Sequence, residues 1–311
     1  MPHSPTAWGR LLWQVTAAAL VLTIALAAAI AAQAFYYAAL DYGGKAPPTA
    51  LLDHPEQTGI AGLTTVGFAR HDGTPVAGWY VPSRNRAAVI VTTGTSSNRT
   101  SMLPEIRILA SAEFGVLAFD WPGTGRSAGR IDWGDPALAT FESAIDWLSQ
   151  RPDVDPARIG ALGFSAGGMV TVRAAAMDTR LRAVVLSGTA SESDETQAWF
   201  HRSSRPLHQL PTEWAARYFG WPLGIVRPAI LVAEIVPRPV LLIGGSVETD
   251  AAPQEVARMC AAAHAPKECW VVPGAAHGGY AAAAPQEYAS RLVDFFSRGL
   301  LGAVPERHAA R

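Results

Sequence analysis

Thirty consecutive residues near the amino terminus, 11–40, carry no charged side chain. As an α-helix this stretch would be about 45 Å long, more than the roughly 30 Å hydrocarbon core of a bilayer. Trp13 stands near one end and the aromatic trio 35–37 near the other. These aromatics are separated by about one bilayer thickness, as an aromatic belt at both interfaces requires. The sequence therefore predicts a short tail over residues 1–10 and a transmembrane anchor over residues 11–40.

Two other interpretations of this stretch stay open. Residues 32–34 (AQA) form an acceptable signal-peptidase site, but the apolar region of a signal peptide is normally shorter. A buried core helix is the third interpretation, although so long an uncharged stretch is unusual in a soluble domain. We favour a retained anchor. Arg10 and the terminal amino group lie before the span, against Lys45 alone after it. This balance predicts a cytoplasmic amino terminus with the rest of the chain outside the cytoplasm, or secreted if the segment is cleaved.

The amino-acid composition excludes several classes of protein. The protein has 311 residues, of which 49% are hydrophobic and 16% charged, so it can bury a large core and a mainly disordered chain is excluded. A formal net charge of −1 gives no electrostatic reason to expect a nucleic-acid partner. The two cysteines are too few for a disulfide-dense miniature or a cysteine-rich zinc module. We expect no metal and no cofactor.

Strands alternate with helices beyond a Pro- and Gly-rich linker predicted over residues 41–60. Short apolar runs rich in β-branched residues suit strands buried on both faces, and the alternation predicts a doubly wound, mostly parallel α/β sheet. The first two strands flank a polar turn and are expected to form an antiparallel hairpin. The predicted strands are 63–69, 76–81, 87–92, 116–119, 159–164, 183–186, 239–243 and 269–272, and the predicted helices are 101–112, 136–148, 166–176, 253–263 and 285–296.

One aromatic insertion, about 188–236, interrupts this alternation. Its length and its aromatic residues indicate an ordered, helical segment, which is either a flap that completes the core or a lid over a site. If it walls an apolar pocket, Trp199, Phe200 and Trp214 are the candidates for contact with substrate.

The motif Gly163-Phe164-Ser165-Ala166-Gly167 is the most informative for chemistry. It matches G-x-S-x-G and stands between an apolar strand and a helix, where a sharp turn presents a nucleophilic serine. Glycines on both sides relieve the crowding of such a turn. The hydroxyl of Ser165 would then project at the carboxyl edge of the sheet, where open α/β sheets hold their ligands.

From about Gly62 to Leu301 the chain resembles serine hydrolases of the α/β-hydrolase superfamily, in particular the membrane-anchored, lid-bearing α/β-hydrolase-domain proteins. The resemblance implies an α/β-hydrolase domain over residues 61–302, followed by a tail over residues 303–311. The family carries a His-Gly loop after its third strand, and here Thr93 replaces that histidine. The match implies that backbone N–H groups of Thr95 and Ala166 form the oxyanion hole.

His277 and an acid complete the resemblance. His277 follows the last strand in a glycine-rich loop, which matches the superfamily order of serine, acid and histidine. The family's acid lies in the loop after strand 239–243, where its spacing selects Glu248, while Asp250 remains the alternative. The family's turn after its fourth strand implies that Asp120 satisfies turn amides and has no catalytic role.

Cys260 and Cys269 allow two interpretations. Outside the cytoplasm the pair can close a disulfide around a short loop, and otherwise both are buried free thiols. We favour the disulfide.

These observations predict a membrane-anchored serine hydrolase that cleaves carboxylic esters, with acyl or lipid-like small molecules as substrates. Peptidase, thioesterase and acyltransferase chemistry use the same catalytic groups and stay open, because a fold does not select a reaction. A catalytically silent, membrane-tethered binding module is the alternative of a different class. The presence of Ser165, His277 and Glu248 in the expected order argues against it, and the replacement at Thr93 is the feature that favours it.

Overall fold

The computed structural model describes residues 7–43, 49–191, 214, 217–221, 227–248 and 253–302. Within these residues the strands form one eight-stranded sheet in the order β1-β2-β4-β3-β5-β6-β7-β8. The pairs β1–β2 and β2–β4 are antiparallel, and every other neighbouring pair is parallel. The predicted hairpin and the mostly parallel sheet are therefore confirmed. The strands are β1 (Thr64–Ala69), β2 (Pro75–Val81), β3 (Ala88–Thr92), β4 (Gly115–Phe119), β5 (Ile159–Phe164), β6 (Leu181–Ser187), β7 (Val240–Gly245) and β8 (Lys267–Val272).

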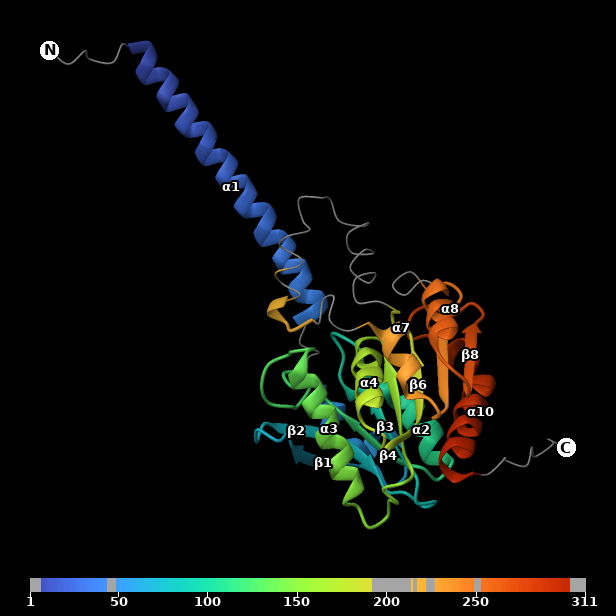
Figure 1. Cartoon of the computed structure of the whole chain (residues 1–311). Helices are drawn as coiled ribbons and strands as arrows, with labels where there is room; N and C mark the ends of the chain where they lie inside the picture. Colours follow the sequence, from blue (N-terminus) through green and yellow to red (C-terminus); the bar gives the residue numbers. More distant parts are fainter. Residues whose placement is uncertain are drawn as a thin grey trace.

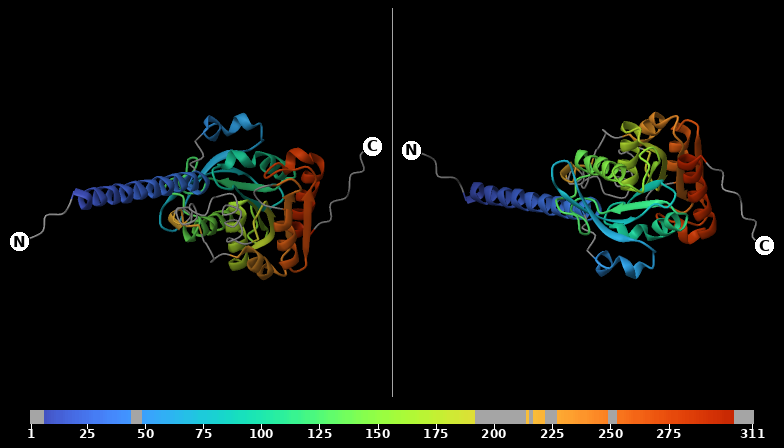
Figure 2. Two further views of the ribbon diagram at one scale, coloured as in Figure 1. Left: turned by 90° about the horizontal axis from the view of Figure 1, so that it is seen from above. Right: turned by 90° about the horizontal axis from the view of Figure 1, so that it is seen from below.

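Helices cover both faces of the sheet (Figure 2). In the central strand β3, Ile90 belongs to the core under α3, α4 and α8, whereas Val91 belongs to the core under α2 and α10. Because successive strand residues face opposite sides, two cores explain why inner strands such as β3 and β4 are buried along their whole length. The helices are α2 (Leu103–Ser111), α3 (Asp135–Ser149), α4 (Ala166–Met177), α7 (Pro228–Leu231), α8 (Pro253–Ala262), α9 (Tyr280–Ala283) and α10 (Pro285–Phe296).

The amino-terminal helix α1 (Ala7–Gly43) projects away from the sheet domain (Figure 1). Its segment Trp8–Gln33 is long and apolar enough to cross a membrane. The helix extends past the predicted bound at residue 40 into the segment predicted as a linker.

Part of the predicted linker 41–60 belongs to the folded domain. Its second half forms two short 3-10 turns, Ala50–Leu52 and Pro55–Thr58. The side chain of Leu52 is fully buried, and its carbonyl oxygen accepts a hydrogen bond of 3.0 Å from the Arg99 guanidinium. This packing differs from the expectation of a free linker, because apolar residues within the Pro-rich stretch have a core to enter.

Most of the insertion predicted over 188–236 lies outside the described residues. Its two ends meet, because the Ala229 N–H donates a 2.8 Å hydrogen bond to the Ser191 carbonyl. The buried Glu255 of α8 accepts hydrogen bonds from the backbone and hydroxyl of Ser191. The insertion therefore leaves and rejoins the domain at one place, between β6 and β7.

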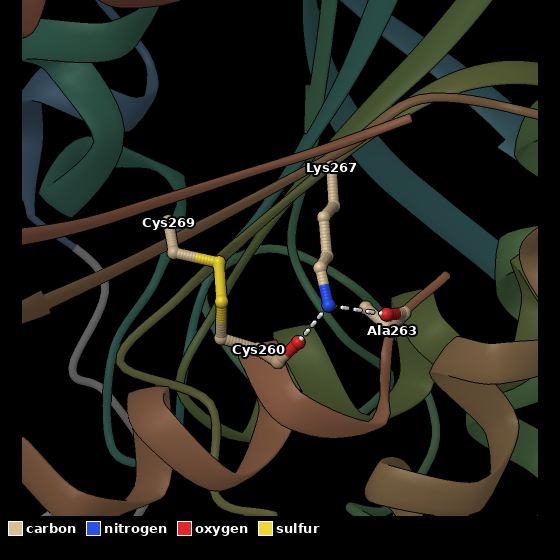
Figure 3. The surroundings of a disulfide bond; sticks show 4 residues. All are labelled: Cys260, Ala263, Lys267 and Cys269. Carbon is tan, nitrogen blue, oxygen red and sulfur yellow. Dashed lines mark hydrogen bonds between the residues drawn. A yellow bond between two sulfur atoms is a disulfide. The ribbon is translucent and has the colours of Figure 1, made fainter. Parts of the chain in front are cut away.

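A disulfide bond joins Cys260 near the end of α8 to Cys269 in β8 (Figure 3). The Lys267 ammonium donates hydrogen bonds to the carbonyls of Cys260 and Ala263, at 2.6 and 2.7 Å. A cation at a helix carboxyl terminus satisfies free carbonyls and complements the helix dipole. The disulfide and the hydrogen bonds from Lys267 together hold α8 against β8.

We expect replacement of both cysteines by serine to lower the free energy of unfolding by about 2–4 kcal/mol, because the bond restricts the unfolded chain. Urea unfolding of the full-length protein in detergent measures this change. Reduction of the wild-type protein should shift its urea midpoint to that of the double variant. Equal midpoints for wild type and double variant under oxidising conditions would contradict the prediction.

Candidate active site

Ser165 occupies a tight turn between β5 and α4. Its backbone has φ 54° and ψ −122°, a sparsely populated region for a residue with a side chain. The turn is held by a 2.9 Å hydrogen bond from the Ser165 N–H to the Ser187 carbonyl at the end of β6. The strand-turn-helix context that the G-x-S-x-G motif predicts is therefore present.

The two glycines of the motif are required by close packing around this turn. A Cβ at Gly163 would overlap the Thr171 hydroxyl, and one at Gly167 would overlap the Thr93 carbonyl. Because α4 starts directly after Ser165, its first turn must pass close to both β5 and the loop after β3. Glycine at these positions allows that approach.

The loop after β3 lies against Ser165. A Cβ built on Gly94 would be 2.8 Å from Ser165 Cβ, so the backbone of this loop passes the nucleophile candidate closely. Thr95 follows and is half-buried. Trp121 Nε1 donates a 2.9 Å hydrogen bond to the Thr93 carbonyl. This tryptophan supports the loop at the position where the family has histidine.

His277 and Glu248 lie together at the same edge of the sheet, after β8 and β7. Nδ1 of His277 is 3.2 Å from Oε2 of Glu248. The second oxygen, Oε1, accepts hydrogen bonds from the Gly245 N–H and the Tyr280 hydroxyl. The carboxylate is buried, whereas the imidazole is 23% exposed. The acid is thus fixed by three contacts, and the histidine keeps one side accessible.

Tyr280 is a site residue that the sequence analysis did not identify. Burial and the neighbouring Glu248 carboxylate raise the pKa of its hydroxyl, so this group stays a hydrogen-bond donor. Tyr280 follows His277 by three residues at the start of α9, which is the only signal in the sequence that places it near the site.

The imidazole of His277 lies beside the turn that carries Ser165. The ring of Phe164 is 4.8 Å from it between centroids, and a Cβ built on Gly188 would be 2.7 Å from its Cε1. Among the described residues no hydrogen bond reaches the Ser165 hydroxyl. In apo structures catalytic hydrogen bonds are often long and tighten only when substrate binds.

A shallow pocket adjoins the turn; it is partly open to solvent and has a cavity volume of about 10 Å³. Its walls are mainly apolar, and Ala166 brings it next to Ser165. Arg173 contributes a cation that pairs with Asp135 at 2.6 Å. None of these wall residues except Ala166 was predicted from the sequence. The lining residues are Trp133, Gly134, Ala166, Met169, Val170, Arg173 and Trp221.

Of the other residues that the sequence suggested for the site, three are not described by the structure and one is exposed. Asp250, Trp199 and Phe200 lie outside the described residues. Trp214 is 65% exposed, and of the two tryptophans of the insertion that the structure describes, Trp221 is the one that lines the pocket. Among the described residues, no group of three or more His, Cys, Asp or Glu side chains is arranged to hold a metal ion.

The expected structural role of Asp120 is confirmed. Its buried carboxylate accepts 2.9 Å hydrogen bonds from the backbone N–H groups of Arg99 and Arg126. It also pairs with the buried Arg99 guanidinium, which lies 4.8 Å from the Trp79 ring. Asp120 therefore organises the turn after β4, from which Trp121 reaches the loop after β3.

Comparison with known proteins agrees with this geometry. Residues 100–302, more than half of the chain, match the prolyl oligopeptidase family. The uncharacterized protein Rv2307c of Mycobacterium tuberculosis is 35% identical over 211 residues, which cover 66% of this chain and 69% of the relative. The uncharacterized protein YfhR of Escherichia coli is 26% identical over 246 residues, covering 76% and 81%.

The esterase Pf2001 of Pyrococcus furiosus has a similar structure, with a TM-score of 0.70, 23% sequence identity and coverage of 83% of this chain and 98% of the esterase. At this identity the likeness shows the fold alone. It confirms the α/β-hydrolase resemblance on which the sequence analysis relied. The chain therefore belongs to the prolyl oligopeptidase family and is a serine-type hydrolase with the α/β-hydrolase fold.

Proposed function

We propose that the protein is a membrane-anchored serine hydrolase that cleaves carboxylic esters with Ser165, His277 and Glu248. The contact between His277 Nδ1 and the buried Glu248 carboxylate, at 3.2 Å, carries this proposal. It lies beside the strained turn of Ser165, and a carboxylate on Nδ1 fixes the tautomer in which Nε2 accepts a proton.

In the proposed reaction the Ser165 oxygen attacks the acyl carbonyl carbon while His277 takes the hydroxyl proton. The carbonyl π electrons move to the oxygen and form a tetrahedral oxyanion. Collapse of this intermediate breaks the bond to the leaving alkoxide, which receives the proton from His277 and departs as alcohol. Water then attacks the acyl-enzyme with His277 as base, and the carboxylic acid leaves as Ser165 regains its proton.

The oxyanion would be stabilised by the backbone N–H groups of Thr95 and Ala166. The Ala166 N–H lies at the amino terminus of α4, where free N–H groups and the helix dipole favour negative charge. The approach of the Gly94 backbone to Ser165 supports a contribution from the next residue, Thr95. Removal of one oxyanion-hole donor costs about 3–4 kcal/mol of transition-state stabilisation where such a donor is a side chain.

Peptide hydrolysis is the second candidate, and the name of the matching family favours it. The walls of the pocket are mainly Trp133, Trp221, Met169 and Val170, and they suit the apolar acyl part of an ester or of a peptide alike. Such a surface stabilises an acyl group by burial. Rates on matched p-nitrophenyl esters and p-nitroanilides with the same acyl group would separate the two activities.

The anchor and its orientation are also part of the proposal. The exposed apolar span Trp8–Gln33 supports insertion of α1 in a membrane. The disulfide between Cys260 and Cys269 supports a location of the hydrolase domain outside the cytoplasm, since disulfides persist in oxidising compartments.

A fluorophosphonate probe tests the proposal directly. The full-length protein in detergent should be labelled on Ser165, because the probe reacts with a serine that an adjacent base activates. Labelling should vanish in Ser165→Ala and persist in Ser290→Ala, which removes an exposed serine on α10. Absence of labelling in folded wild-type protein would favour the silent binding module instead.

A further inference from the structure

The end of the membrane-spanning segment contacts the insertion that approaches the pocket. The ring of Phe35 in α1 is 6.0 Å from the ring of Tyr218, in an edge-to-face arrangement. Figure 1 shows this part of the insertion, in orange, beside the end of α1 that meets the domain. Aromatic pairs of this geometry contribute about 0.5–1.5 kcal/mol beyond their burial, so the contact holds residues 217–221 at a defined level along α1.

We place this level at the surface of the bilayer, because Phe35 belongs to the aromatic trio 35–37 that the sequence predicts at one membrane interface. The segment that is long and apolar enough to span a membrane reaches Gln33, and Phe35 lies two residues later, or about 3 Å along a helix. Tyr218 is 53% exposed, and Trp214 is 65% exposed. Exposed tyrosine and tryptophan side chains are typical of the interface between lipid and water, where an apolar ring and a polar group both find partners.

Arg130 adds a positive charge at the same place. Its guanidinium lies 4.5 Å from the centre of the Tyr218 ring, and its Nη2 donates a 2.6 Å hydrogen bond to the Tyr218 carbonyl. The residue is exposed. An arginine at the membrane surface is attracted to anionic head groups by about 1 kcal/mol. The charge of Arg130 and the exposed rings of Tyr218 and Trp214 therefore all favour contact with an anionic lipid bilayer.

The segment leads from this surface to the pocket in a few residues. The Phe219 carbonyl accepts a 3.0 Å hydrogen bond from the Trp133 N–H, and the rings of Trp221 and Trp133 lie 6.1 Å apart. Both tryptophans line the pocket beside Ala166. One end of this continuous segment therefore meets α1, and the other end forms the pocket wall.

We propose that residues 217–221, with Trp214 and Arg130, form a membrane-contact site, and that the hydrolase takes amphiphilic acyl esters directly from an anionic lipid bilayer. This inference rests on the proposed ester hydrolysis and names the substrate class of that same site. An ester whose acyl chain lies in the membrane then reaches Ser165 along the tryptophan wall without crossing water.

The test uses the full-length protein reconstituted in vesicles of phosphatidylcholine and phosphatidylglycerol. Two substrates share one leaving group: 4-methylumbelliferyl acetate in the water and a long-chain 4-methylumbelliferyl ester in the bilayer. The measured quantity is the rate on the bilayer ester divided by the rate on the acetate. We expect Tyr218→Ser and Trp214→Ser each to lower this ratio about fivefold, as the loss of one interfacial aromatic contact of about 1 kcal/mol predicts.

Met177→Ser is the matched control. Met177 is 63% exposed, but it stands at the opposite end of the twelve-residue helix α4 from Ser165, so both rates should stay at the wild-type value. A ratio unchanged in both aromatic variants overturns the inference. If the wild-type protein hydrolyses neither the acetate nor the long-chain ester, the proposed ester hydrolysis itself is wrong.

Contact with lipid has its own readout. Brominated phosphatidylcholine quenches tryptophan within the bilayer interface. The measurement is made in the Ser165→Ala background and needs no activity, and the quenched fraction of the emission should be lower when Trp214→Phe is added to that background. An equal quenched fraction in the two proteins overturns the membrane-contact site, whereas a lower one supports it even if the esterase assay fails.

Discussion

Replacement of Ser165 by alanine is expected to lower kcat for ester hydrolysis by a factor of about 10⁴ or more, because the acyl-enzyme pathway needs the hydroxyl as nucleophile. Residual turnover would come from binding and from the oxyanion donors, which the substitution leaves in place. Steady-state rates on a p-nitrophenyl ester measure the change. The binding step should persist, so the variant should still bind an ester or its product.

Stability should change little in the same variant. No hydrogen bond to the Ser165 hydroxyl occurs among the described residues, so its removal leaves no buried partner unsatisfied. The positive φ of 54° is equally unfavourable for alanine. Thermal unfolding of wild type, Ser165→Ala and the surface control Ser290→Ala should therefore coincide. Retained turnover would place the nucleophile elsewhere, and an unfolded variant would make Ser165 a structural residue.

The parts of the fold that depend on neighbouring residues were predictable from the sequence. The apolar run before Ser165 and the small residues after it predicted a strand, a turn and a helix, and the structure has β5 (Ile159–Phe164) and α4 (Ala166–Met177) there. Gly163 and Gly167 carry this information because any side chain at either position would overlap the packing around the turn.

The parts that depend on distant residues were not predictable. Trp133 and Trp221 meet in the pocket wall although each stands in a segment without regular periodicity. Tyr280 donates to Glu248 across 32 positions of the chain, and a tyrosine in a loop gives no local sign of that partner. Leu52 is buried within a Pro-rich stretch whose composition indicates a linker. The spacing of residues after the strand 239–243 left both Glu248 and Asp250 as alternatives for the catalytic acid.

Replacement of Glu248 by glutamine should reduce kcat by about 10⁴-fold with little change in folding, as the loss of the correct histidine tautomer does in serine hydrolases. The Gly245 N–H and the Tyr280 hydroxyl both donate to Oε1, so they would hold the amide oxygen of glutamine at that position. The amide NH₂ group would then face His277 Nδ1. A donor there requires Nδ1 as acceptor and places the remaining proton on Nε2, which can no longer act as base.

Asp250→Asn is the matched substitution, since it also exchanges a carboxylate for an amide and lies two residues later in the sequence. If Asp250 is a solvated loop charge, its replacement should change kcat by no more than about twofold. Measurement of both variants on one ester, with thermal unfolding as the check on folding, separates the two acids. Loss of rate in Asp250→Asn alone would move the acid to Asp250 and leave Glu248 as a buried carboxylate that positions the loop. Loss in Glu248→Gln alone would assign the acid to the residue whose partners already fix its orientation.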